Sequence, residues 1–315
     1  MDRPAQARDV TVVVPNFNGA HLLIQTLDAL VAQGEPELDV LVVDNGSTDG
    51  SRALLDSRPD VRVLALPTNT GFAGAANAGA RATDRPWLVV LNSDARPQRG
   101  WLTALLAHVQ QGDVWAWGSV LVDPQGAIES AGDGWRHGTT AYKLLQGRPV
   151  DELPARPYEV FSPPGAAPLF NRDVFVQLGG YDERFFLYYE DIDLAWRARL
   201  LGHRAVLVPA ARVTHELGAS SRPFRTWFHI ARNGLWCGVR NPPQLRPRLL
   251  LAATRREWRN AGRRGVRWPY FCGRAAGVAG LPRQLLVRRT LQATRTVDPA
   301  VLQAFLDRQE SLVHA

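Results

Sequence analysis

Short β-branched runs that alternate with helix-like stretches constrain the first 120 residues of this 315-residue chain more than any other feature. The alternation is typical of an α/β fold with a mostly parallel sheet flanked by helices. The runs lie at 10–14, 40–43, 61–64 and 87–91, and the clearest helical stretches lie at 20–32 and 73–82. Each run ends in a polar or glycine-rich loop, namely PNFNG, DNGSTDG, NTGFAG or NSDARP. Because ligands bind beyond the carboxyl ends of the strands in such sheets, we expect these loops to line one crevice.

The chain is less regular after this part. Residues 115–168 are rich in Gly and Pro and show little periodicity, so we interpret them as a variable region over the site. A small-residue strand is expected at 165–170 and a last strand at 206–208. Apolar residues recur at helical spacing after Glu190, which predicts a helix that begins there and is closed by Gly202.

Charge divides the chain into two parts. Residues 1–221 contain 19 basic and 26 acidic residues, whereas 222–295 contain 17 arginines and one acidic residue, Glu257. We therefore expect an acidic domain at 1–221 followed by a basic, mainly helical region at 222–315. Almost every basic residue is arginine, and Lys143 is the only lysine.

The basic region has an amphipathic pattern. After Pro247, a helical projection separates two sets of side chains, Arg248, Arg255 and Arg259 on one side and Leu250, Leu251 and Trp258 on the other. This pattern is typical of a helix that lies in an anionic membrane surface. Solvated helices that pack on the rest of the protein are an alternative. No nucleic-acid partner is predicted, because the first half carries no nucleic-acid-binding motif.

The sequence also predicts a location. The N-terminal segment MDRPAQARDV lacks the apolar core of a secretory signal, and no run of 18 or more uncharged apolar residues occurs. We expect a cytoplasmic protein, peripheral on the inner face of the plasma membrane where the basic region docks. Cys237 and Cys272 are too few for a disulfide framework and are expected to be free thiols.

Two strand ends carry candidate ligand-binding side chains. Asn92, Ser93 and Asp94 directly follow the apolar strand WLVVL. A hard cation such as Mg²⁺ or Mn²⁺ binds one or two carboxylates and completes its shell with diphosphate oxygens and water, a role that suits Asp94. An ordinary turn is the alternative for this triplet. Asp44, at the tip of LVVD, can accept hydrogen bonds from a base or ribose, or it can cap the next helix, as Asp49 could.

Three further motifs hold candidate functional residues. Glu190, Asp191 and Asp193 follow an aromatic run, and apolar walls raise the pKa of a carboxylate and make it a better base. A favourable interaction with the helix macrodipole is the alternative explanation for these acids. His215 is either a metal ligand or a structural histidine. The small residues of NTGFAGAANAG, with Asn77, would let backbone approach a phosphate, although the dinucleotide fingerprint is absent.

The order and spacing of these motifs resemble those of the family 2 glycosyltransferases, which have the GT-A fold. The motifs are VVVPNFNG, VVDNGSTDGS, NTGFAGAANAG, LNSD, GGYDERFFLYYEDIDLAWR and THELGAS, and they cover residues 10–221. The sequence looks most like the rhamnosyltransferase-type branch, which builds bacterial surface polysaccharide or cell-wall linkers. The resemblance implies a donor half at 1–118 and an acceptor half at 119–221.

The resemblance also implies a role for each matching position. Asp191 corresponds to the general base, Glu190 to a group that orients the acceptor, and His215 to a residue that completes the metal shell in some members. Many relatives have Asp at the first position of the metal triplet, whereas this chain has Asn92, so metal binding would rest on Asp94 and His215. The donor-binding positions are Pro15, Asn16, Phe17 and Asp44 for the nucleoside, Asn77 for the donor region, and Asn92, Ser93 and Asp94 for the ribose and the metal-bound diphosphate.

These roles predict a metal-dependent, inverting glycosyltransferase that uses Mg²⁺ or Mn²⁺. The donor would be a nucleoside-diphosphate sugar, with dTDP-rhamnose as one candidate, and the acceptor a glycan or polyprenyl-linked sugar in surface polysaccharide or cell-wall synthesis. A sugar-nucleotide nucleotidyltransferase is one alternative, but it would need a basic glycine-rich loop in place of PNFNGAHL. A catalytically inactive carbohydrate-binding protein is the other, and the intact Asp94, Asp191 and His215 disfavour it.

Overall fold

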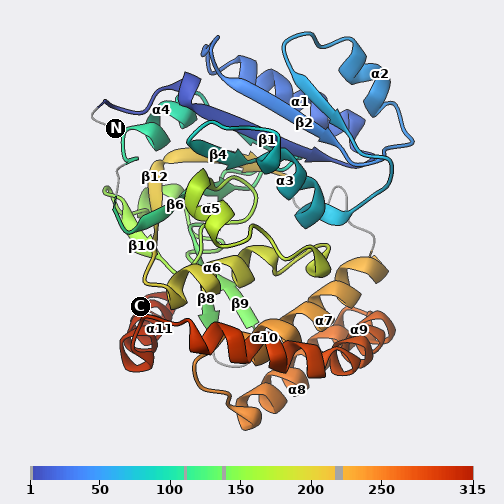
Figure 1. Ribbon diagram of the computed structural model, residues 1–315, viewed down its shortest axis with the longest axis vertical. Helices are drawn as coiled ribbons and strands as arrows, with labels where there is room; N and C mark the ends of the chain where they lie inside the picture. Colours follow the sequence, from blue (N-terminus) through green and yellow to red (C-terminus); the bar gives the residue numbers. More distant parts are fainter. Residues whose placement is uncertain (1–2, 110–111, 137–139, 217–222, 315) are drawn as a thin grey trace.

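A computed structural model of the chain describes residues 3–109, 112–136, 140–216 and 223–314. Figure 1 shows two layers: a twisted sheet with its flanking helices, coloured blue to green, lies above a group of orange and red helices from the C-terminal region. The end of the THELGAS motif and the first residue of the expected basic region lie outside the described residues.

The N-terminal half of the sheet is parallel, as the sequence predicts. Its strands are β1 (Val10–Asn16), β2 (Asp39–Asp44), β3 (Arg62–Ala65) and β4 (Trp87–Val90), and the helices between them are α1 (Ala20–Val31), α2 (Ser51–Asp56) and α3 (Gly71–Arg81). The strands lie in the order β3-β2-β1-β4, and Asn16 pairs with Asp44 where β1 and β2 end. The polar loops after these strands therefore meet at one edge of the sheet.

Burial of β1 on both faces explains its continuous β-branched sequence. Val12 and Val14 pack with α1, and Val13 packs with α3, because successive side chains of a strand point to opposite faces. A Cβ atom at Gly79 would lie only 2.3 Å from a methyl carbon of Val13. This close approach of α3 to the sheet explains why that helix consists largely of Gly and Ala.

The second half of the sheet contains more strands than expected. β5 (Ala95–Pro97), β6 (Val114–Val122), β7 (Ile128–Ser130), β10 (Tyr158–Val160), β11 (Leu169–Asn171) and β12 (Arg204–His215) complete a ten-stranded sheet in the order β10-β12-β6-β11-β4-β1-β2-β3, with β5 on β12 and β7 on β6. β12 is parallel to β6, whereas β11 is antiparallel to β4 and β6. A separate hairpin contains β8 (Asp133–Arg136) and β9 (Thr140–Lys143).

The expectation of an irregular region at 115–168 is therefore wrong. Three-residue strands such as β7 and β10 are too short to show a periodic pattern in the sequence. The final strand is also longer than the expected 206–208, because a bulge between Val208 and Arg212 lets β12 continue along β6.

The helices of the second half agree better with expectation. They are α4 (Trp101–Leu106), α5 (Arg172–Gln177) and α6 (Glu190–Leu200), with short 3₁₀ helices at Val150–Glu152 and Glu183–Phe185, and a further 3₁₀ helix, Ala7–Asp9, precedes β1. α6 begins at Glu190 as predicted. Gly202 follows it with φ of 87°, the left-handed conformation that ends many helices and that glycine adopts without strain.

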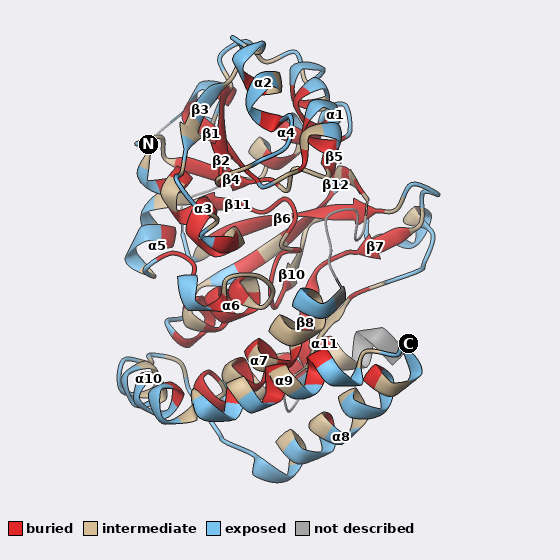
Figure 2. Ribbon diagram, turned by 90° about the vertical axis from the view of Figure 1, so that its right-hand side faces the viewer, coloured by how far each residue is buried: buried red, intermediate tan, exposed pale blue. Residues whose placement is uncertain are grey.

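The C-terminal region is helical, as predicted, and it packs on the rest of the protein. Its helices are α7 (Pro223–Arg240), α8 (Pro247–Arg263), α9 (Arg267–Ala279), α10 (Leu281–Ala293) and α11 (Pro299–His314). α7 contacts α9 and α10, α6 contacts α10, and α11 contacts β8. Figure 2 shows that α7 is largely buried and that much of α8 is exposed. Among the described helices, none combines the length and the apolar character needed to cross a bilayer. Cys237 and Cys272 are free thiols, as expected.

Candidate active site

A cavity of about 270 Å³ opens at the carboxyl ends of β1 and β4. Its wall brings together seven of the residues that the sequence singles out, Pro15, Asn16, Phe17, Asn92, Ser93, Asp94 and His215. The side-chain oxygens of Asn16 and Asn92 are buried and have no hydrogen-bond partner within the described part of the chain. A buried polar atom without a partner is costly, so these two oxygens favour a polar ligand in the cavity.

Asn45, which the sequence analysis missed, organises one side of the cavity. Its amide donates to the side-chain oxygen of Asn69 at 3.2 Å and to the carbonyl of Gly71 at 3.1 Å, and its oxygen accepts from the Thr70 backbone at 2.9 Å. The preceding residue, Asp44, is buried, accepts from the Ser47 backbone at 3.2 Å, and is not among the cavity-lining residues. Asn45 could have been identified as a candidate site residue from the sequence, because it directly follows Asp44 in the DNGSTDG loop.

Asn77 also lies away from the cavity. Its amide donates to the Tyr181 carbonyl at 2.8 Å, and its oxygen accepts from the Tyr181 backbone at 2.9 Å. A third bond, at 3.1 Å, reaches the carboxylate of Glu183. The side chain therefore ties α3 to the segment that leads to α6, and this geometry gives no support to a direct donor contact by Asn77.

Asp94 and His215 face each other at the opposite side of the cavity. The distance from Asp94 Oδ1 to His215 Nε2 is 3.2 Å, yet Nε2 is buried and has no hydrogen-bond partner among the described residues. His215 Nδ1 lies 2.8 Å from Glu129 Oε2, and Lys143 Nζ lies 2.6 Å from Glu129 Oε1. The carboxylate of Glu129 thus orients the imidazole and leaves Nε2 to face Asp94.

The charges around His215 are consistent with this arrangement. Burial disfavours the imidazolium, but the carboxylates of Asp94 and Glu129 outweigh it and raise the pKa of His215 to about 9. Burial likewise disfavours the ionised form of Glu129, but its bonds to His215 and Lys143 hold its pKa below the usual value. The imidazolium and Lys143 balance the two carboxylates, so a cation that binds beside Asp94 would take the place of the His215 proton.

The residues present fit a divalent cation that is shared with a substrate. No group of three or more His, Cys, Asp or Glu side chains within the described ranges could enclose a metal ion by itself. One carboxylate oxygen of Asp94 and the Nε2 of His215, once a cation displaces its proton, would instead be a partial donor set, and Mg²⁺ and Mn²⁺ commonly complete such a set with phosphate oxygens and water.

Glu190 and Asp191 lie at the start of α6, outside the cavity wall. Burial and the charge of Asp191 raise the pKa of Glu190 well above its usual value, and one Glu190 oxygen finds no hydrogen-bond partner in the part of the chain that the structure describes. Burial also raises the pKa of Asp191, but the Ile192 backbone bond at 2.8 Å and the charge of Lys143 oppose that effect. The charge of Lys143 therefore favours the ionised form of Asp191.

The β8–β9 hairpin brings two further groups near Asp191 that the sequence analysis did not identify. Asp133 is buried, and burial together with the charge of Asp191 raises its pKa to about 7. Lys143, on the neighbouring strand, lowers the pKa of both aspartates through its charge. The sequence analysis missed them because their strands fall in the region that was interpreted as irregular. Lys143 is the only lysine in the chain, and this could have marked it as a candidate.

The C-terminal helix α7 completes the cavity with Arg225, Thr226 and His229. The His229 ring stacks on Phe186 with centroids 5.3 Å apart and an interplanar angle of 13°. Burial and the nearby charges of Arg232 and Arg225 lower the pKa of His229 to about 4, so the imidazole is neutral at physiological pH. These residues were missed because only tertiary packing brings α7 to the sheet edge.

Comparisons with known proteins identify the family of the chain. Residues 11–179 match the model of the family described as Glycosyl transferase family 2. The chain is 31% identical over 266 residues to the O-antigen biosynthesis protein RfbC of Myxococcus xanthus, a match that covers 78% of this chain but spans only 20% of that protein. It is 32% identical over 241 residues to the N-acetylglucosaminyl-diphospho-decaprenol L-rhamnosyltransferase of Mycobacterium tuberculosis, covering 67% of this chain and 76% of that protein.

A solved structure has the same architecture. The mannosyltransferase PcManGT from Pyrobaculum calidifontis, in complex with GDP-Man and Mn²⁺, superimposes with a TM-score of 0.55 at 22% identity, covering 99% of this chain and 87% of that chain. This likeness confirms the expected fold. The chain belongs to the family 2 glycosyltransferases, with the GT-A fold, and resembles the rhamnosyltransferase-type branch of that family.

Proposed function

We propose that this chain is an inverting, metal-dependent glycosyltransferase. The observation that carries the proposal is the cavity that presents Asp94 and His215 Nε2, with Asp191 in the first turn of the helix that follows the cavity-lining residue Tyr188. Because burial and the charge of Asp191 favour the neutral form of Glu190, whereas Lys143 favours the ionised form of Asp191, we assign the base to Asp191. A single base favours direct displacement by the acceptor, whereas a covalent sugar intermediate would require a second carboxylate as nucleophile.

Each part of the site has a role in this reaction. Pro15, Asn16 and Phe17 receive the nucleoside, and Asn92 and Ser93 lie where the ribose would bind, with the donor at the strand ends. Asp44 and Asn77 support this pocket by holding its loops.

Asp191 removes the proton of an acceptor hydroxyl as the hydroxyl oxygen bonds to the anomeric carbon of the sugar. The bond from that carbon to the nucleoside diphosphate breaks at the same time, so the configuration inverts. A cation held by Asp94 and His215 would neutralise the charge on the departing diphosphate. Glu190, as a neutral acid, can orient the acceptor by donating a hydrogen bond.

The choice of substrates to test first comes from the relatives. The name of the Mycobacterium tuberculosis relative describes rhamnose transfer to N-acetylglucosaminyl-diphospho-decaprenol, and that of the Myxococcus xanthus relative describes O-antigen biosynthesis. We therefore propose dTDP-rhamnose as the donor and a polyprenyl-linked sugar as the acceptor, in polysaccharide or cell-wall synthesis. Membership of a glycosyltransferase family removes the nucleotidyltransferase alternative.

Thermal unfolding of the purified protein with a panel of nucleotide sugars tests this proposal. Binding to the native state raises the unfolding temperature, so the true donor should protect the protein, and more strongly with Mn²⁺ than with EDTA. Asp94→Ala should lose the Mn²⁺-dependent part of the protection and the transfer activity, while keeping the fold. Full activity in EDTA, or a product that retains the anomeric configuration of the donor, would contradict the mechanism.

We also propose that the outer face of the C-terminal helices docks on an anionic membrane. Trp268 and Phe271 of α9 are 67% and 53% exposed, and their rings stack with centroids 5.9 Å apart. The guanidinium of Arg267 lies over the Trp258 ring of α8 at 5.6 Å. Exposed aromatic rings beside arginines suit the boundary between anionic headgroups and acyl chains, where a polyprenyl-linked acceptor resides.

Liposome flotation tests this second proposal. The protein should float with vesicles that contain phosphatidylglycerol, not with pure phosphatidylcholine vesicles, and binding should weaken as salt screens the charges. Replacing Trp268 and Phe271 together by Ala should reduce binding, whereas Val31→Ser, at an exposed apolar residue of α1, should not. Absence of binding to anionic vesicles at low salt would refute membrane docking.

A further inference from the structure

The loop before α6 has an unusual backbone. Phe186, Tyr188 and Tyr189 have φ angles of 67°, 66° and 71°, in the left-handed region that residues other than glycine rarely adopt. Three such residues within four positions are strained, and strain of this kind persists only where surrounding contacts impose it. The loop also matters to the site, because Phe186, Leu187 and Tyr188 line the cavity and Tyr189 directly precedes Glu190.

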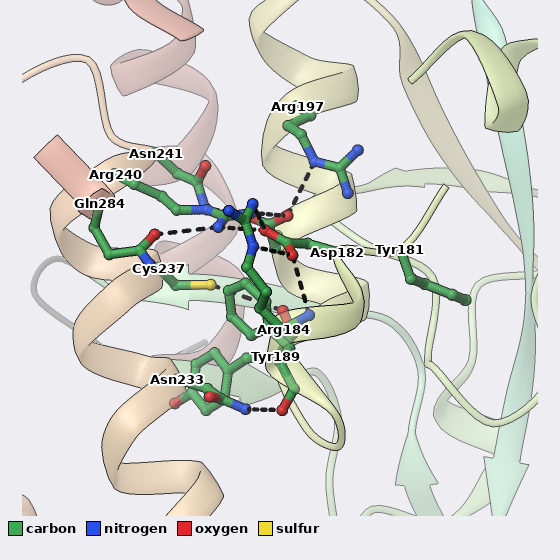
Figure 3. A network of polar contacts seen from close by, with 12 residues as sticks. Tyr181, Asp182, Arg184, Tyr189, Arg197, Asn233, Cys237, Arg240, Asn241 and Gln284 are labelled. Carbon is green, nitrogen blue, oxygen red and sulfur yellow. Dashed lines mark hydrogen bonds and ion pairs between the residues drawn. The ribbon is translucent and has the colours of Figure 1, made fainter. Parts of the chain in front are cut away.

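A buried asparagine of α7 holds this loop. The side-chain amide of Asn233 lies within hydrogen-bond distance of three loop carbonyls, those of Phe185 at 3.0 Å, Leu187 at 2.9 Å and Tyr188 at 2.7 Å. Asn233 is completely buried. Figure 3 shows its amide on α7, directed at the loop. An amide group has two hydrogens, so three carbonyls can share them only if the loop keeps its bent shape.

Arg232, the preceding residue, fixes the direction of this amide. Its Nε donates to the Asn233 side-chain oxygen at 2.8 Å, so the NH₂ group of Asn233 must face the loop. The same guanidinium donates through Nη2 to the carbonyls of Arg184 at 2.9 Å and Phe185 at 2.8 Å. The two side chains together satisfy four consecutive or near-consecutive loop carbonyls.

Arg240, further along α7, anchors both ends of the same segment. It binds Asp182 before the loop at 2.7 Å (Figure 3) and Asp193 after it at 2.6 Å. All three side chains are largely buried. Asn241 donates to Asp193 as well, at 2.8 Å. Asp193 therefore ties α6 to α7, and the loop between the two aspartates is held at its ends and in its middle by one helix.

We propose that Asn233 is a positioning residue of the active site, which keeps the strained loop in the shape that forms the cavity wall and presents Asp191. The inference rests on the proposed function, in that the cavity and Asp191 are the reacting site. It assigns to the C-terminal region a part in catalysis, separate from any docking on a membrane. Asn233 acts through the loop and touches no reacting atom.

Hydrogen exchange measured by mass spectrometry tests the proposal without an identified substrate. In Asn233→Leu, which keeps the volume but removes the donors, backbone amides of residues 183–190 should exchange at least tenfold faster, while those of β1 and β4 stay unchanged. Gln33→Leu is the control, because its partly buried amide also donates to backbone carbonyls, those of Ala29 and Gln98 at 3.1 Å, and neither residue belongs to the network that anchors the loop. Arg232→Gln, at a partly exposed site, should give a smaller local effect and serves if Asn233→Leu does not fold.

A nucleoside diphosphate binding assay tests whether the shape of the loop affects the cavity. With Mn²⁺ present, the wild type and the control should bind one of UDP, GDP or dTDP equally well, and Asn233→Leu should bind it at least tenfold more weakly. Unchanged exchange at 183–190 in both α7 variants, or equal acceleration in every part of the protein, would overturn the proposal. A wild type that binds none of the three nucleotides would contradict the proposed function, whereas the exchange result would still decide the role of Asn233.

Discussion

Replacement of Asp133 by Asn should stabilise this protein at alkaline pH. Asp133 lies on β8 and is 9% exposed, and burial and the charge of Asp191 raise its pKa from 3.8 to about 7. Asn has the same shape, carries no charge, and keeps an oxygen that can accept the 2.9 Å hydrogen bond from Ser130 Oγ.

The sign and size of the effect follow from the two pKa values. The unfolded chain releases the Asp133 proton near pH 4, while the folded protein keeps it until about pH 7, so stability falls as pH rises through this interval. Relative to strongly acid pH, a pKa raised from 3.8 to about 7 lowers the free energy of unfolding by roughly 4 kcal/mol above pH 7 and by roughly 1.6 kcal/mol at pH 5. The advantage of Asn over Asp should therefore grow by roughly 2 to 3 kcal/mol between pH 5 and pH 8.

Urea unfolding at pH 5 and pH 8 measures this difference. The comparison needs wild type, Asp133→Asn and Asp84→Asn, an exposed aspartate that controls for the loss of one negative charge. The control should change little between the two pH values. If Asp133→Asn gains no more stability at pH 8 than at pH 5, Asp133 is ionised in the folded protein at both, and the described electrostatics of this pocket are incorrect.

Three further predictions concern the reaction and the fold. Asp191→Asn should lower kcat by about 10² to 10⁴ with little change in donor affinity, and Glu190→Gln should lose less; the reverse ranking in steady-state kinetics would exchange their roles. Glu129→Gln should weaken Mn²⁺ binding about 10- to 100-fold in calorimetry, because His215 loses its orienting charge, and an unchanged affinity would refute that link. Gly79→Ala should destabilise the protein by about 1 to 3 kcal/mol in urea unfolding, because the new Cβ meets Val13. Gly262→Ala should be neutral or stabilising, because its Cβ meets only the flexible end of the Arg267 side chain.

The parallel half of the fold could be predicted because each of its strands can be recognised from its own short stretch of sequence. Each strand of β1, β2 and β4 is buried on both faces, so it appears in the sequence as an uninterrupted apolar run. The strands between residues 115 and 168 give no such signal, since several are three residues long and Gly118 interrupts β6. Their pairing depends on partners far away in the sequence, as in the contact of β6 with β12.

The same division applies to the site. Residues at the ends of parallel strands, such as Asn16 and Asp94, could be predicted, because topology alone brings those ends together. Glu129 and Asp133 could not, since their strands were not recognised and their importance depends on contacts with His215 and Asp191. Asp44 and Asn77 were expected to contact the donor, but both side chains bond to loops beside the cavity. Position in the sequence near a site does not determine where a side chain points.

The arginine-rich region shows why a charge count cannot assign function. The sequence left open whether this region lies on a membrane or packs on the protein, and two kinds of arginine occupy it. Arg240 is buried between two aspartates and stabilises the active-site loop, whereas Arg267 is exposed beside Trp258 and Trp268. Arg225, His229 and Arg232 recur on α7 at intervals of four and three residues, so a helical projection places them on one face, and this is the face that meets the cavity and its loop. Spacing within each helix, and not total charge, separates arginines that build the site from those available to a membrane.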